Sequence, residues 1–116
     1  MLVRLSSVEP TARPTSPRAV SGRRAVGEHV VVGEWSLERA AWTDRHFHEE
    51  LNYVIEGELH VTYDDETYVA VAGDVVVVPA GKRARYAAPA FARMVYVYGP
   101  SEDGHAAHDV EYTDLD

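Results

Sequence analysis

The chain has 116 residues, of which 46% are hydrophobic, and it contains no cysteine. This length is typical of one domain with one core, and the lack of cysteine excludes disulfides and thiolate metal sites. The formal net charge of −8 disfavours binding to nucleic acid, because an acidic body repels phosphate. No apolar run approaches the roughly 20 residues of a membrane-spanning helix, so we expect a cytoplasmic protein with neither nucleic-acid nor membrane partners.

The two ends of the chain differ from its middle in composition. Residues 1–27 contain five arginines and three prolines, which favours a flexible basic arm rich in Pro and Ser. Residues 101–116 contain six acidic residues and neither Lys nor Arg, which indicates an acidic tail. We therefore assign the folded domain to residues 28–100 and expect both ends to be solvated.

The middle of the chain has a β pattern, with turn residues between short apolar segments and no ten-residue stretch of helical period. The expected strands cover residues 30–32, 35–37, 51–55, 59–63, 67–71, 75–78, 83–87 and 93–98. The unbroken valines of residues 75–78 predict a strand that is buried on both faces. Many short strands of this kind predict an all-β sandwich or a small barrel.

A candidate metal site lies just before the strand expected at residues 51–55. In an extended chain, His46, His48 and Glu50 point to the same side, because side chains alternate with period 2. Two imidazoles and a carboxylate form a ligand set for a divalent ion such as Fe, Zn, Mn or Ni, and three protein ligands leave positions open for catalysis. The alternative is a polar strand end exposed to solvent beside Asp44 and Glu49.

Three short segments resemble the paired motifs of the cupin superfamily. They are Glu56-Gly57-Glu58-Leu59, Ala72-Gly73-Asp74 and Pro79-Ala80-Gly81. The resemblance implies an RmlC-like double-stranded β-helix, the cupin jelly-roll barrel, over residues 28–100. The segments 49–51, 54–59 and 92–97 are similar to the EutQ-type cupins of ethanolamine utilisation. Because small cupins usually pair their sheets, the resemblance also implies a homodimer.

The ligand register within the first cupin motif has three solutions. If Glu50 takes the glutamate position, His46 takes that of the second histidine, Asp44 that of the first, and His48 lies in a connection. If His46 and His48 take the two histidine positions, the glutamate position falls on Asn52. We favour a third solution, in which a shortened connection brings His46, His48 and Glu50 together.

The second cupin motif places its histidine at Ala84, so the usual fourth ligand is absent. Tyr86 shares the strand face of Ala84, and its hydroxyl is a candidate hydrogen-bond donor or general acid. Tyr86 and Glu50 are therefore our candidate catalytic residues, although a packing role for Tyr86 is the alternative. Asn52 follows Glu50 on the same face and is a candidate substrate contact or supporting donor. Arg85 is a candidate for binding a carboxylate or phosphate, with ordinary surface charge as the alternative.

These residues leave two functions open. The first is a small metal-binding cupin enzyme that acts on a small polar metabolite as a lyase, isomerase or dioxygenase. The second is a metal-free EutQ-like accessory cupin that binds a ligand without redox chemistry of its own. Under both, we expect Trp35 and Trp42 to be packing residues near the barrel mouth or a dimer face.

Overall fold

The computed structural model describes residues 1–7, 17–100 and 108–116. Strands dominate these ranges, whose one helical element is a single 3-10 turn, so the all-β prediction is confirmed. The elements are η1 (Leu5–Ser7), β1 (Ala19–Val26), β2 (Val31–Arg45), β3 (Glu49–Tyr63), β4 (Glu66–Val71), β5 (Val75–Val78), β6 (Arg83–Gly99) and β7 (His108–Asp114).

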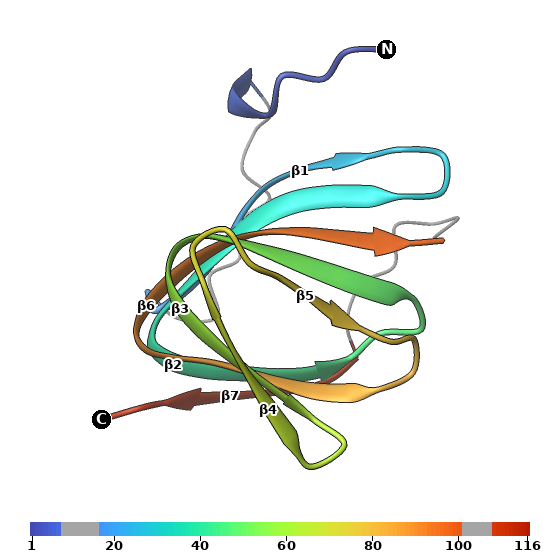
Figure 1. Cartoon of the computed structure of the whole chain (residues 1–116). Coiled ribbons are helices and arrows are strands. Elements are labelled where there is room, and N and C mark those ends of the chain that lie inside the picture. Colours follow the sequence, from blue (N-terminus) through green and yellow to red (C-terminus); the bar gives the residue numbers. More distant parts are fainter. Residues whose placement is uncertain (8–16, 101–107) are drawn as a thin grey trace.

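Three long strands, β2, β3 and β6, form the frame of the barrel and curve together (Figure 1). The sheet order is β1-β2-β6-β3-β4, with β5 paired to β3 and β7 paired to β2. Register shifts interrupt the ladders between Glu38 and Ala40 on β2 and between Val54 and Glu56 on β3. Such irregularities bend a strand locally, which lets one sheet wrap around a single core.

Both expected tails contribute a strand to the same edge of β2. β1 pairs with residues 31–37 of β2, and β7 pairs with residues 40–45. The change of partner falls at Arg39, whose φ is 45°. Near this point the Arg18 guanidinium lies 3.0 Å from the carboxylate of Asp116, which links the basic and the acidic end.

Residues 19–26 and 108–114 therefore form strands where we expected a flexible arm and a tail, although most of their side chains remain exposed or half-buried. Residues 18–26 contain no proline, so each of their backbone N–H groups is available for pairing. Polar composition concealed both strands, because a strand at a solvated edge needs few apolar side chains to satisfy its backbone.

The core lies on the concave face of the sheet. Val54, Leu59, Val61 and Met94 are all 0% exposed. The prediction that residues 75–78 are buried on both faces was wrong. β5 pairs with β3, and only one face of β5 covers the core. Its valines consequently alternate between exposed and buried.

Two local features fix how β3 turns. Gly57 has a φ of 81°, and a Cβ at this position would collide with the backbone carbonyl of Phe91 on β6. Only glycine combines this backbone conformation with so close an approach. At the end of β3, Asp64 and Asp65 have φ values of 51° and 63°, which form the tight turn into β4.

Candidate functional site

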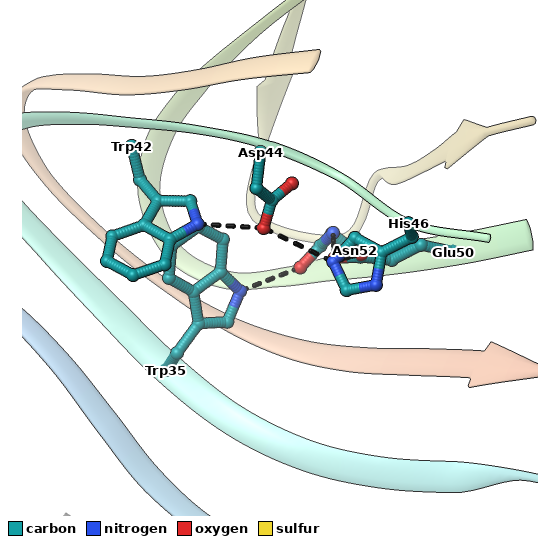
Figure 2. A network of polar contacts seen from close by, with 6 residues as sticks. All are labelled: Trp35, Trp42, Asp44, His46, Glu50 and Asn52. Carbon is teal, nitrogen blue, oxygen red and sulfur yellow. Dashed lines mark hydrogen bonds and ion pairs between the residues drawn. The ribbon is translucent and has the colours of Figure 1, made fainter. Parts of the chain in front are cut away.

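A cluster of buried polar side chains lies on the inner face of β2 and β3 (Figure 2). Period 2 places Asp44 and the adjoining His46 on one side of the chain, and it places Glu50 and Asn52 on one side of β3. Asp44 is 5% exposed, His46 9%, Glu50 5% and Asn52 0%. We call these four residues the interior cluster.

Hydrogen bonds and an ion pair join the interior cluster into one connected network. The His46 ring Nε2 lies 2.7 Å from Glu50 Oε2 and 3.2 Å from Asp44 Oδ2. The Asn52 amide donates to Glu50 Oε1 at 2.9 Å. Burying these polar groups would be costly if they lacked such partners, and the contacts hold the two carboxylates against the imidazole.

Two tryptophans support the interior cluster from β2. The indole N–H of Trp42 donates to Asp44 Oδ2 at 2.8 Å, and that of Trp35 donates to Asn52 Oδ1 at 2.8 Å (Figure 2). Sequence reasoning had assigned both tryptophans to packing. The spacing of Trp42 and Asp44 on one strand face was a usable signal. Trp35 gave none, because its contact joins two strands far apart in sequence.

The electrostatics of the interior cluster favour a charged imidazole. Burial acts most strongly on His46 and lowers its pKa, but hydrogen bonds and charges from Asp44 and Glu50 together outweigh burial and raise the pKa to about 10. With His46 protonated, the two carboxylates and the imidazolium still carry a net charge of −1. A neutral His46 would leave −2, so the interior cluster is anionic either way.

Tyr86 reaches the interior from β6 and is 1% exposed. Its hydroxyl has no hydrogen-bond partner within residues 1–7, 17–100 and 108–116, and the same is true of Asp44 Oδ1. The Tyr86 ring packs edge-on against Trp35 with a centroid separation of 5.4 Å. Burial, followed by the negative charges of Glu50 and Asp44, raises the pKa of Tyr86 well above its ordinary value. The hydroxyl is therefore a neutral donor near the carboxylates.

The structure groups the candidate metal ligands differently from the register that we favoured. β2 runs through Arg45, the His46 ring contacts Asp44 and Glu50, and His48 lies in the bend before β3. The His48 ring stacks on Tyr98 with centroids 5.3 Å apart and lies 6.4 Å from the His46 ring.

A divalent ion does not fit this arrangement of side chains. Among the described residues, no group of three His, Cys, Asp or Glu side chains is arranged to hold a metal. The reason is visible at His46, whose Nε2 faces two carboxylates as a proton donor instead of offering a lone pair.

The remaining candidates divide between the two faces of the sheet. Asn52 and Glu50 lie where the sequence placed them, inside the barrel. Arg85 lies one residue before Tyr86 on β6 and is exposed on the opposite face, so it does not reach the interior cluster. Its neighbours Lys82 and Arg83 form surface ion pairs with Asp64 and Glu111.

The curved antiparallel barrel, with polar residues at the first-motif positions, defines a cupin. Its backbone matches the RmlC-like cupin of Shewanella frigidimarina with a TM-score of 0.71 at 19% identity, over 84% of this chain and 88% of that one. The predicted jelly-roll fold is thereby confirmed. The family model described as "Ethanolamine utilisation protein EutQ" matches residues 5–104, and the chain belongs to this family.

Two relatives from Salmonella typhimurium give the family assignment further weight. The structure of an ethanolamine utilization protein Q matches with a TM-score of 0.70 at 29% identity, over 85% of each chain. The protein called acetate kinase EutQ is 37% identical over 77 residues, which are 65% of this chain and 33% of that protein. This chain thus matches about a third of that relative's length. No helix among the described residues is long and apolar enough to cross a membrane.

Proposed function

We propose that this chain is a metal-free ligand-binding cupin, whose interior cluster holds one small polar molecule. A single observation carries the proposal. Two atoms of the interior cluster, Asp44 Oδ1 and His46 Nδ1, and the Tyr86 hydroxyl beside it are buried without a hydrogen-bond partner among the described residues. Leaving such atoms unpaired costs about 1–3 kcal/mol each, so a bound molecule that satisfies them is favoured.

Binding is the role that the described residues support better than phosphoryl transfer. The relatives named acetate kinase extend well beyond the part that this chain matches. Phosphoryl transfer relies on cationic groups that neutralise developing charge. The interior cluster supplies carboxylates instead, and Lys82 and Arg83 at the start of β6 are engaged with acidic partners on the surface.

The proposal is tested by thermal unfolding with small polar solutes after treatment with EDTA. At least one solute should raise the Tm of the wild type, and the shift should disappear in Asn52→Leu, which breaks the network at its centre. Thr62→Ala is the control, because it removes an exposed hydrogen bond to Thr67 that involves none of the interior cluster. An equal shift in Asn52→Leu would place the ligand elsewhere and contradict the proposal.

A metal-dependent enzyme is the second candidate. One observation favours it: Asp44, His46 and Glu50 occupy the ligand positions of the first cupin motif and contact one another. Binding a divalent ion there would require His46 to lose its proton and turn away from the carboxylates. Metal analysis of tag-free protein decides between the candidates. One equivalent of Fe, Zn, Mn or Ni, lost in His46→Ala, would establish a metal site at the interior cluster and overturn the metal-free proposal.

We also propose that the protein is a cytoplasmic homodimer. The support is an apolar surface on the outer faces of β4 and β5, where Val69, Val71, Val75 and Val77 are between 43% and 55% exposed. Val69, Val75 and Val77 also line a groove between these two edge strands. Burying such a patch against a second copy would be favourable, and sedimentation should give a dimer mass. A monomer at all concentrations would contradict this part of the proposal.

A further inference from the structure

We infer that the ligand of the interior cluster is a small organic ammonium ion. This inference rests on the proposed binding function and specifies the chemical class of its ligand. The geometry points to a cation because the interior cluster combines two buried carboxylates with one imidazole, and its buried atoms without a hydrogen-bond partner include the carboxylate oxygen Asp44 Oδ1 as well as His46 Nδ1.

The charge balance of the interior discriminates between ligand classes. A carboxylate or a phosphate would bring another negative charge against Asp44 and Glu50, where low exposure leaves little water to screen the repulsion. A cation would instead complete the balance, and an ammonium N–H is a good donor to an unpaired carboxylate oxygen. The name of the Salmonella relative, acetate kinase, implies an anionic substrate, and the interior cluster of this chain is unsuited to one.

The cations that the protein itself supplies do not satisfy this need. Arg85 points to the outer face of β6. Arg45 donates to the carbonyl of Gly81 and lies 3.5 Å from Asp109. Arg24 on β1 acts on Tyr96, two residues before Tyr98. None of these printed contacts joins an arginine to Asp44 Oδ1, which has no hydrogen-bond partner among the described residues.

The aromatic surroundings favour an organic ammonium ion over a metal. Trp35 and Tyr86 present an edge-to-face aromatic pair next to the polar network. Aromatic faces attract ammonium groups, but they offer no ligand to a divalent ion. The buried Tyr86 hydroxyl supplies a hydrogen bond to an oxygen on the same ligand. A small amine with a neighbouring hydroxyl therefore matches the available groups best.

Isothermal titration calorimetry on the full chain at pH 7 tests the inference with four probes: ethanolamine, propylamine, acetate and Zn²⁺. Ethanolamine should bind, and acetate should not. Asp44→Asn keeps the shape but removes the charge, and should weaken ethanolamine binding about tenfold or more. Glu58→Gln is the matched control, because Glu58 is an exposed carboxylate on β3, and it should leave the affinity unchanged. Near-UV circular dichroism verifies that both variants are folded.

Tyr86→Phe provides a second variant, which retains the ring and its contact with Trp35. It should weaken binding of ethanolamine and leave propylamine, which lacks the hydroxyl, unaffected. Equal losses for both amines would overturn the assigned role of the hydroxyl.

The experiment distinguishes a wrong inference about the ligand class from a wrong proposal that the interior cluster binds a ligand. If acetate binds and Asp44→Asn strengthens it, the interior cluster is a ligand site but the ammonium inference is wrong. If Zn²⁺ binds with one equivalent and excludes ethanolamine, the inference and the metal-free proposal are both wrong. If neither ethanolamine, propylamine nor acetate binds, the ammonium inference is overturned, and the failure of the wider solute screen would then overturn the binding function.

Discussion

The inner face of β3 changes its chemistry halfway along the strand. In the first half, Glu50 and Asn52 are 5% and 0% exposed, and in the second half Leu59 and Val61 are both 0% exposed. The two halves are equally buried on the same strand, but one is polar and the other apolar. An apolar pair would serve the core as well or better, so the polar half is the place where the proposed ligand binding is to be tested.

The largest expected effect is in the apolar half. Leu59→Ala should lower the free energy of unfolding by about 2–5 kcal/mol, because it deletes buried methyl groups and leaves a cavity. Urea denaturation measures this loss. Val26→Ala at the exposed end of β1 is the control and should change stability by no more than about 0.5 kcal/mol. If Leu59→Ala also abolished ligand binding in the folded protein, the two halves would not be separable.

In the polar half, Asn52→Ala should cost about 1–3 kcal/mol, because the Trp35 N–H and a Glu50 oxygen each lose a buried partner. Unlike Leu59→Ala, it should also remove ligand binding. The same denaturation experiment, combined with calorimetry, measures both effects. A stability change near zero would indicate that the network is not formed in solution, and the comparison between the halves would fail.

A smaller loss of stability is expected when the Trp42 indole N–H, which donates to Asp44 of the interior cluster, is removed. Trp42→Phe keeps an aromatic ring but removes the N–H that donates to Asp44, and should lower stability by about 1 kcal/mol. Tyr112→Phe, which removes a hydrogen bond to the exposed Asp114, is the control and should have almost no effect. An equal loss of stability in both variants would mean that the buried Trp42–Asp44 hydrogen bond contributes no more than the exposed Tyr112–Asp114 hydrogen bond.

The last prediction compares how the stability of the wild type and of His46→Gln depends on pH. The pKa of His46 is raised from 6.5 to about 10 in the folded protein, so the native state holds a proton that the unfolded state has lost. The stabilisation is fully present below pH 6.5 and is lost as the pH rises through about 10. Between pH 7 and 9, wild-type stability should therefore fall more steeply than that of His46→Gln, whereas parallel curves would exclude the charged imidazole. Chemical denaturation across this range measures both slopes.

Much of the barrel was predictable from the sequence, because strand periodicity, turn residues and the three motif glycines are local signals. The valines of β5, Gly57 and the Asp64-Asp65 turn all belong to this class. The strands β1 and β7 were missed, because their polar edges carry no apolar alternation. They form by pairing with β2, which is a long-range contact.

By itself, the sequence determined an all-β cupin with Glu50, Asn52, His46 and a tyrosine near one site, since spacing and alternation place side chains on a face. Only the tertiary structure decided which of Asp44 and His48 joins His46. β2 extends through Arg45 and points Asp44 inward, leaving His48 to stack on Tyr98. Asp44 and His48 would lie on the same side of a continuous strand, so alternation alone does not choose between them, and the bend at residues 47–48 takes His48 off that face. Distances across strands, not spacing along them, therefore decide the chemistry of this site.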